Sequence, residues 1–178
     1  MKALIISAND FEDLELYYPY YRLKEEGWDI TIAAPDTGTI AGKHGYSVPI
    51  ESKFSDINPD EFDILFIPGG RAPEEVRINE NALRIVNSFF DDGKIVASIC
   101  HGAQVLVSAN RVLGRKITCW KGVRDDVLAA GGLYTDTEVV VDGNLVSSRM
   151  PVDLPAFMRE LMKLTRMAVQ LEQARRAA

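Results

Sequence analysis

Residues 94–102, with the sequence KIVASICHG, constrain the fold of this chain more than any other stretch. Residues 95–99 form an apolar, β-branched run without polar alternation, which is typical of a strand buried on both faces of a parallel sheet. An apolar helical pattern begins at Ala103. The chain must therefore turn sharply from a strand into a helix, and Cys100 is predicted to lie in a strained elbow with its side chain exposed.

Cys100 is the candidate nucleophile. Ser98 and Gly102 flank it two positions away on either side, and such small neighbours leave room for a sharp turn. Free NH groups and the dipole at the start of the following helix favour a thiolate over a thiol. A cysteine at the end of a strand is more often a small core residue, but its place between a strand and a helix favours a reactive thiol. Limiting iodoacetamide should then alkylate Cys100 before Cys119.

The composition predicts a single domain over residues 1–178, with a frayed tail over residues 171–178. Of the 178 residues, 47% are hydrophobic, which is ample for one core. The chain has 20 Lys and Arg against 26 Asp and Glu and no basic block, so neither nucleic acid nor an anionic membrane is expected as a partner. The opening MKALIIS is too short for a signal peptide, and no apolar run approaches about 18 residues. We therefore expect a cytoplasmic protein.

The few cysteines and histidines argue against a metal centre. The cysteines, Cys100 and Cys119, have no CxxC or metal-ligand spacing and form no disulfide framework, as expected in a reducing compartment. The chain has only two histidines, His44 and His101. No metal and no other cofactor is expected.

Short apolar runs alternate with helical patterns along the chain. Strands are predicted at residues 2–7, 28–34, 63–67 and 94–99, and a hairpin or excursion at the sheet edge at residues 39–55. Helices are predicted at residues 13–26, 74–90, 125–130 and 153–171, a brief strand at residues 116–119 and a hairpin at residues 138–147. Pro19 should kink or interrupt the first helix. This order predicts an open three-layer α/β sandwich with a mostly parallel sheet.

Ligands bind beyond the carboxyl ends of the strands in such sheets. Residues 9–12, 68–72 and 100–101 follow three predicted strands, so they should meet in one crevice. Glu12 could then face the Cys100 sulfur and share a proton with it, as a donor or as a general acid and base. An acidic residue at a helix start also complements the helix dipole, and the sequence leaves these two roles of Glu12 equally open.

Gly69 and Gly70 follow the third predicted strand, where their bare NH groups could approach a substrate oxygen. Together with the amide of His101 they would make an oxyanion hole, although a Gly-Gly turn alone is a weak signal. The His101 ring is not expected to face Cys100 without a particular rotamer. No histidine lies downstream of the elbow, which argues against a glutamine amidotransferase.

Four motifs resemble the PfpI family of intracellular cysteine peptidases, within the ThiJ/PfpI superfamily that also contains glyoxalases and proposed deglycases. They are ANDFEDLE, IPGGRAPE, ASICHGAQ and VVVDGN followed by VSSR, within a resemblance over residues 1 to about 166. The resemblance implies a flavodoxin-like fold with a nucleophile elbow, and dimers assembled into a hexameric ring. It also implies that Cys100 is the nucleophile with His101 as its partner, and that Glu74 of a neighbouring subunit orients His101.

The resemblance extends to the rest of the site. Glu12 corresponds to the family's buried carboxylate beside the sulfur, and Gly70 with His101 to its oxyanion hole. Trp120 stands where close relatives are expected to have a tyrosine near the pocket, so a proton transfer assigned to a phenolic hydroxyl there is in doubt.

Three functions follow from these residues. The family name favours a peptidase, in which Cys100 attacks a peptide carbonyl and water clears the acyl-enzyme. The alternative is a glutathione-independent glyoxalase or protein deglycase, in which the thiolate adds to methylglyoxal or its adducts and Glu12 moves a proton between carbons. A third class is a redox sensor or holdase in which Cys100 oxidises to a sulfinate that Glu12 stabilises.

Overall fold

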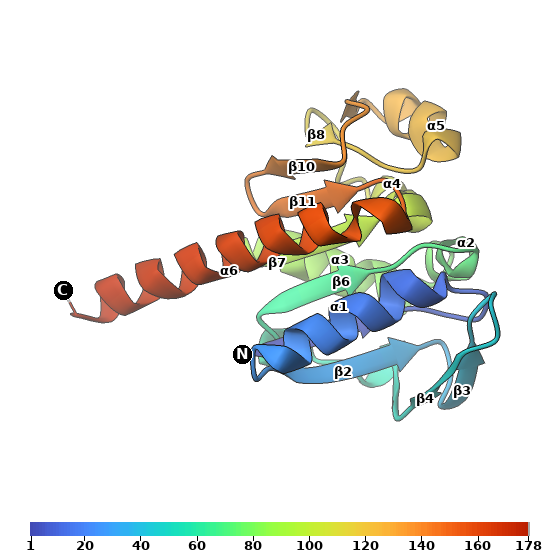
Figure 1. The fold of residues 1–178 in the computed structure, drawn as a ribbon, viewed down its shortest axis with the longest axis horizontal. Coiled ribbons are helices and arrows are strands. Elements are labelled where there is room, and N and C mark those ends of the chain that lie inside the picture. Colours follow the sequence, from blue (N-terminus) through green and yellow to red (C-terminus); the bar gives the residue numbers. More distant parts are fainter. Residues whose placement is uncertain (178) are drawn as a thin grey trace.

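A seven-stranded sheet forms the centre of the computed structural model, which describes residues 1–177 (Figure 1). The strand order is β10-β11-β7-β6-β1-β2-β5, and every neighbouring pair is parallel except β10 with β11. The strands of this sheet are β1 (Lys2–Ile6), β2 (Asp29–Ala34), β5 (Ser52–Lys53), β6 (Ile64–Ile67), β7 (Ile95–Ile99), β10 (Val139–Asp142) and β11 (Leu145–Ser148). The mostly parallel sheet predicted from the sequence is confirmed.

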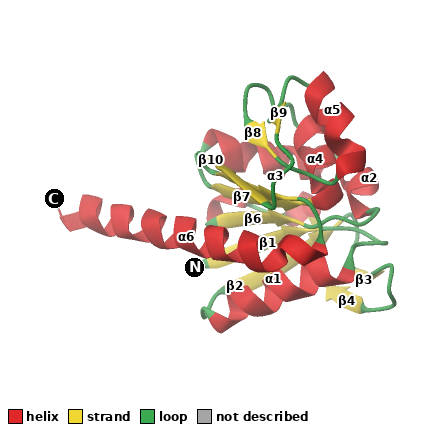
Figure 2. Ribbon diagram, turned by 45° about the horizontal axis from the view of Figure 1, so that its top comes forward, coloured by secondary structure: helices red, strands yellow, loops and turns green. Residues whose placement is uncertain are grey.

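Helices cover both faces of the sheet. They are α1 (Asp13–Glu25), α2 (Ala72–Val76), α3 (Glu80–Asp91), α4 (Ala103–Ser108), α5 (Arg124–Ala129) and α6 (Leu154–Ala177). Helices α1 and α6 pack together on one face, and α3 lies on the other (Figures 1 and 2). This arrangement is the predicted three-layer sandwich.

The central strands are buried along their length because helices lie on both sides of them. All residues of β6 and β7 are buried, and only Lys2 of β1 is exposed. Burying an Ile or Leu side chain stabilises a fold by roughly 1.5–3 kcal/mol. The core of the sheet therefore holds rigidly the strand ends from which the site is built.

One helix prediction was wrong. The helix predicted over residues 74–90 is two helices, α2 and α3, because the Asn79 side chain accepts hydrogen bonds from the NH groups of Asn81 and Ala82 and so starts a new helix. Helix α1 runs from Asp13 to Glu25 through the buried Pro19, so Pro19 does not interrupt it, and the predicted kink there stays a prediction.

Smaller strands lie outside the central sheet. Strands β3 (Gly38–Ala41) and β4 (Ser47–Ile50) form the predicted excursion as an antiparallel hairpin, and β5 extends it to the sheet edge beside β2. The strand predicted over residues 116–119 is shorter, β8 (Lys116–Ile117), and it pairs with β9 (Leu133–Tyr134) instead of joining the central sheet.

Helix α6 runs beyond its predicted end at Leu171 and projects away from the sheet (Figure 1). The frayed tail predicted over residues 171–178 is helical through Ala177, its fraying stays a prediction, and Ala178 lies outside the described residues. Over residues 1–177, no helix is both long and apolar enough to span a membrane.

Candidate active site

Cys100 lies in the predicted elbow. It follows β7 directly, its φ is +60°, and α4 begins three residues later at Ala103. A Cβ atom on Gly102 would lie 2.6 Å from the Ile67 carbonyl oxygen and 2.8 Å from Ser98 Oγ, so the turn requires glycine there. The Cys100 side chain is less exposed than predicted, because the residue is only 8% accessible. Such backbone strain is a feature of functional sites.

The loops after β1, β6 and β7 meet as predicted. The NH of Glu12 donates to the Gly69 carbonyl over 3.1 Å, and the NH of Arg71 donates to the Asp10 carbonyl over 2.8 Å. Gly70 has a φ of +81°, and any Cβ there would collide with the backbone of residues 10–12. The glycine loop after β6 is thus pressed between the other two loops.

Glu15 is the carboxyl group beside the Cys100 thiol. Its side chain is fully buried, and its Oε2 accepts a 2.8 Å hydrogen bond from the NH of Gly69. A Cβ atom on Gly69 would lie 2.5 Å from this Oε2 and 2.6 Å from Cys100 Cβ, which places both side chains against the same glycine. Burial, aided by the nearby charge of Glu12, raises the pKa of Glu15 to about 8. This carboxyl group therefore holds a proton at neutral pH.

The prediction had placed Glu12, not Glu15, beside the sulfur. Glu12 is also buried, but its Oε2 lies 2.5 Å from Lys43 Nζ and 3.5 Å from His44 Nε2. It precedes α1, yet its side chain accepts no capping hydrogen bond. Of the two roles that the sequence left open for Glu12, its place at the start of α1 suits the helix dipole, whereas the structure pairs its carboxylate with Lys43 and places Glu15 beside the sulfur.

A signal for Glu15 was present in the sequence. In α1 the buried residues include Leu16, Pro19 and Leu23, and Glu15 lies four positions before Pro19, on the same side of the helix. An acidic residue on a core-facing stripe is rarely buried without a specific partner. That pattern distinguishes Glu15 from acidic residues that only complement a helix dipole.

The backbone around Cys100 opposes the effect of burial. Burial raises the pKa of the Cys100 thiol, and the charge of Glu15 acts in the same direction. Hydrogen bonds from the NH groups of His101 and Gly70 to the sulfur lower it, but burial outweighs them. The thiolate predicted from the helix start is therefore not favoured at rest, and it forms most easily while Glu15 is protonated and neutral.

These NH groups match only part of the predicted oxyanion hole. The amides of Gly70 and His101 hydrogen bond to the Cys100 sulfur, and their contact with a substrate oxygen stays a prediction. The NH of Gly69 instead donates to Glu15. Gly69 thus supports the carboxyl group and has no amide left for a substrate.

The His101 ring faces Cys100, a contact that was expected only with a particular rotamer and that agrees with the partner role implied by the family resemblance. His101 Nδ1 lies 3.2 Å from Cys100 Sγ. Burial lowers the pKa of His101, while the charge of Glu74 in the same chain raises it. A neutral imidazole at this distance can accept the thiol proton. Glu74 is exposed at the start of α2, and its action from a neighbouring subunit stays a prediction.

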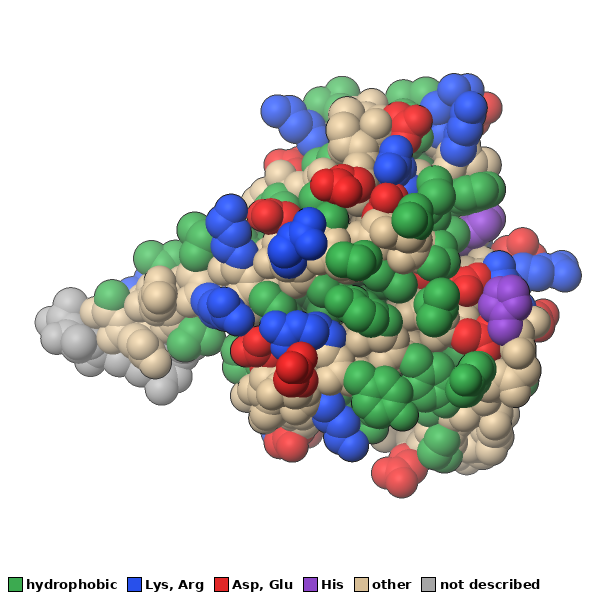
Figure 3. Space-filling model, viewed as in Figure 1, with side chains coloured by type: hydrophobic (Ala, Val, Ile, Leu, Met, Phe, Trp, Pro, Cys, Tyr) green, Lys and Arg blue, Asp and Glu red, His purple; other side chains and the backbone are tan. Residues whose placement is uncertain are grey.

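A pocket of about 310 Å³ opens over Cys100. It is lined by Glu12, Glu15, Lys43, Gly70, Arg71, Cys100, His101, Trp120, Met150 and Pro151. Trp120 is 39% exposed, and its ring stacks on His101 with centroids 6.2 Å apart. The two histidines of the chain lie on the same side of the molecule, beside acidic and basic side chains (Figure 3). Most of the predicted site residues line this pocket together with Glu15, whereas the predicted Gly69 and Glu74 are not among its lining residues.

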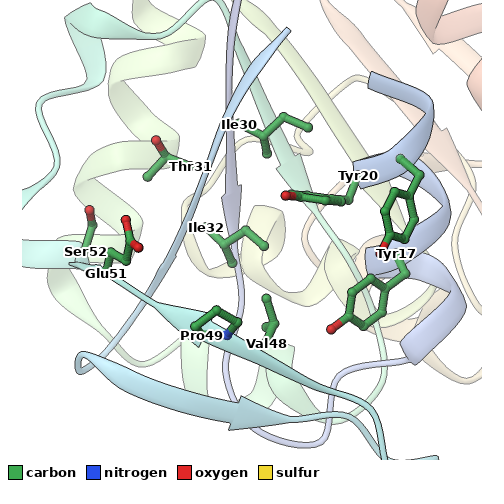
Figure 4. Close-up of a pocket in the computed structure, with 10 residues that line it drawn as sticks. Tyr17, Tyr20, Ile30, Thr31, Ile32, Val48, Pro49, Glu51 and Ser52 are labelled. Atoms are coloured by element: carbon green, nitrogen blue, oxygen red, sulfur yellow. The ribbon is translucent and has the colours of Figure 1, made fainter. Parts of the chain in front are cut away.

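A hollow larger than the Cys100 pocket lies elsewhere. It measures about 430 Å³ between α1, β2 and β4, where Tyr17 and Tyr20 face Ile30 and Ile32 (Figure 4). No cysteine or histidine lines it, so it lacks the thiol and imidazole pair of the Cys100 pocket. Nor do residues 1–177 contain a group of three or more His, Cys, Asp or Glu that could hold a metal ion.

Known proteins share both the sequence and the fold of this chain. The model of the DJ-1/PfpI family matches residues 1–164. The deglycase PH1704 of Pyrococcus horikoshii is 58% identical over 164 residues, which are 92% of this chain and 99% of that protein. A Bacillus subtilis protein named as a candidate cysteine protease, YraA, is 37% identical over 92% of this chain and 97% of its own length.

A solved structure agrees with these relatives. It is a two-domain protein of Anabaena variabilis with a DJ-1/ThiJ/PfpI-like and a ferritin-like domain, which superposes with a TM-score of 0.90 at 34% identity. The match covers 94% of this chain and 48% of that one, so this chain spans about half of the two-domain protein.

Proposed function

The chain belongs to the DJ-1/PfpI family, and on that premise we propose that it is a cysteine-dependent deglycase that acts on methylglyoxal and on its adducts with amines. The sequence alone ranked a peptidase first. The relatives of highest identity among those compared are named deglycases, whereas the protease name occurs at 37% identity. The site chemistry favours the same choice.

The observation that carries the proposal is the buried carboxyl group of Glu15. With a pKa of about 8, it can both give and take a proton near neutral pH beside the reacting carbon on Cys100. Aldehyde isomerisation needs such a group, because a proton must move between adjacent carbons. Hydrolysis of a peptide through an acyl-enzyme gives this carboxyl group no evident task.

The proposed reaction begins at sulfur. The thiol proton passes to His101 Nδ1 as Sγ bonds to the aldehyde-derived carbon of the adduct, and the carbon–nitrogen bond breaks as the amine leaves with a proton. Free methylglyoxal enters the same hemithioacetal by simple addition. The amides of Gly70 and His101 stabilise the oxyanion that forms during these steps.

Glu15 then completes the isomerisation. In its ionised form, which a pKa of about 8 leaves accessible near neutral pH, Glu15 removes the proton from the sulfur-bearing carbon and returns it to the neighbouring carbonyl carbon, while the hydroxyl proton moves to the other oxygen. The first carbon is oxidised and the second reduced, so no external oxidant is needed. Water cleaves the resulting thioester to lactate and regenerates the Cys100 thiol.

We also propose that the active form is a homo-oligomer, between a dimer and a hexamer, in which Glu74 of a neighbouring subunit contacts His101. Support comes from the family resemblance and from the exposed position of Glu74 beside the site. Within one chain, Glu74 already acts on His101 through its charge. Dilution below the assembly concentration should then lower the activity per subunit.

A peptidase remains the second candidate because the elbow, His101 and the two amides also suit acyl transfer. The test incubates the wild type, Cys100→Ala, Glu15→Gln and the matched variant Glu12→Gln with methylglyoxal, and separately with a fluorogenic peptide. Lactate measured by NMR should be formed by the wild type and lost in Cys100→Ala and Glu15→Gln. Peptide cleavage that needs Cys100 but survives Glu15→Gln, without lactate formation, would overturn the proposal.

A further inference from the structure

Two cations stand at the mouth of the Cys100 pocket. Lys43 comes from the β3–β4 loop, and Arg71 follows the glycine loop after β6. The proposed chemistry assigns neither of them a task. Lys43 is paired with a carboxylate and Arg71 is not, and this difference indicates which chemical groups the pocket can bind.

Lys43 is held firmly and its charge is compensated. Its NH donates to the Phe11 carbonyl over 3.0 Å, and Asp13 fixes the same loop by accepting from the NH groups of His44 and Tyr46. The ammonium group lies 2.5 Å from Glu12 Oε2, so this pair adds little net charge. The positive charge of Lys43 still affects the site, because it lowers the pKa values of Glu15 and His101.

Arg71 has a fixed backbone and an uncompensated side chain. Its NH donates to the Asp10 carbonyl, and its guanidinium makes no ion pair and no hydrogen bond with the side chains that the structure describes. The arginines that do pair with carboxylates are Arg22, Arg77, Arg111, Arg124, Arg149 and Arg166. On a chain of net charge −6, a free guanidinium at the pocket mouth is a local reversal of charge.

We infer that Arg71, assisted by Lys43, forms an anion subsite that binds a carboxylate or phosphate group of the substrate while its electrophilic carbon meets Cys100. A guanidinium binds such groups through two parallel hydrogen bonds. The inference rests on the proposed function for its substrate class. Adducts at the α-amine of free amino acids, which carry a carboxylate beside the modified nitrogen, and adducts of nucleotides, which carry a phosphate beyond the sugar, should be preferred over neutral adducts.

The subsite can be tested without the enzymatic reaction. Iodoacetate and iodoacetamide present the same reacting carbon to a thiol, and in both cases the S–C bond forms as iodide leaves, but only iodoacetate carries a carboxylate. The rate constants of both reagents at Cys100 are measured by intact mass in a Cys119→Ala background. The iodoacetate-to-iodoacetamide ratio is then divided by the same ratio for free N-acetylcysteine, and this normalised ratio reports anion binding. We expect this normalised ratio to exceed 1.

Substitution assigns the effect to the subsite. Arg71→Gln should lower the normalised ratio about tenfold, and Arg71→Lys should lower it less, because the charge remains while the paired hydrogen bonds are lost. The matched control is Arg159→Gln, an exposed arginine on α6 outside the pocket, which should leave the ratio unchanged. A ratio near 1 in the wild type, or the same ratio in Arg71→Gln, overturns the inference even if lactate is formed.

A second comparison identifies the source of the anion. Methylglyoxal adducts at the α-amine of alanine and of alaninamide differ by a carboxylate, and adducts of a nucleoside monophosphate and its nucleoside differ by a phosphate. In each pair, kcat/KM of the charged adduct is divided by kcat/KM of the neutral one, and the pair with the larger ratio identifies the preferred anion. Arg71→Gln should remove this preference mainly by raising KM for the charged adduct. Equal loss on charged and neutral members of both pairs would contradict an anion subsite, and absence of lactate from methylglyoxal would contradict the proposed function alone.

Discussion

The surroundings of the two cysteines differ, although both are buried. Cys119 is fully inaccessible and Cys100 is 8% exposed, and burial raises the thiol pKa of both, that of Cys119 to about 12. Only Cys100 has a positive φ, an imidazole at 3.2 Å and a buried carboxyl group beside it. Burial alone thus makes a thiol inert, and reactivity comes from the groups gathered at the carboxyl ends of the strands.

The largest expected effect separates these two thiols. Cys100→Ala should lower lactate formation from methylglyoxal by at least about 10³-fold, because the nucleophile is lost. Cys119→Ala should keep most of the activity, since Cys119 lies outside the pocket lining. NMR of the product measures both variants. Comparable losses of activity in the two variants would show that the elbow does not distinguish Cys100 from Cys119.

The next effect separates the two glutamates near Cys100. Glu15→Gln should lower kcat by about 10²-fold or more, as expected for a general acid and base, with KM less changed. Glu12→Gln should lower it less than tenfold, because Glu12 pairs with Lys43 instead of facing the sulfur. Steady-state kinetics with methylglyoxal distinguishes them, and a larger loss in Glu12→Gln would restore the role first predicted for Glu12.

A measurement of stability against pH also distinguishes Glu15 from Glu12. The folded chain holds the Glu15 proton up to about pH 8, whereas the unfolded chain releases it near the ordinary value of 4.5. Between pH 4.5 and pH 8 the folded chain therefore binds one more proton at Glu15 than the unfolded chain does. The contribution of Glu15 to the free energy of unfolding is complete below pH 4.5. It should fall by about 1 kcal/mol for each pH unit from there up to pH 8. Urea denaturation at pH 5 and pH 8 measures it.

The expected outcome of this experiment is a smaller pH dependence in Glu15→Gln than in the wild type. Glu12→Gln should keep most of the steeper dependence, because burial is the largest cause of the raised pKa of Glu15 and the charge of Glu12 only adds to it. The lowered pKa of His101 acts alike in all three proteins, so the difference between them isolates Glu15. Identical slopes would mean that Glu15 is ionised in the folded chain at neutral pH.

The smallest expected effect concerns Trp120, which connects the two cysteine regions. Trp120 follows Cys119, its NH donates to the Cys100 carbonyl over 3.2 Å, and its ring stacks on His101. Because the indole contributes packing and no transferable proton, Trp120→Tyr should change kcat by about threefold or less. A pH profile of kcat that gains a new ionisation in this variant would contradict a packing role.

Much of the fold was predictable because its determinants are local. The apolar runs of β1, β6 and β7 and the turn at Cys100 fix the parallel sheet and the elbow, and the meeting of three loops follows from sheet geometry. The division of residues 74–90 was missed although Asn79 is a typical N-cap residue.

The site was less predictable than the fold. The exchange of roles between Glu12 and Glu15 depends on which carboxyl group the NH of Gly69 reaches and on the arrival of Lys43 from a hairpin distant in sequence. Spacing from the strand end alone does not decide between two acidic residues one helical turn apart. The His101 rotamer likewise depends on Trp120 and the pocket wall, which tertiary packing supplies.

Helix α6 gives the molecule a natural point of attachment. The pocket opens at the carboxyl ends of the strands, and the helix leaves the body on the opposite side (Figure 1). It also continues past residue 164, where the family match ends. A purification tag, a fluorophore or a solid support joined to the end of α6 would therefore face away from the reactive thiol, and an immobilised chain would present its pocket to the passing solution.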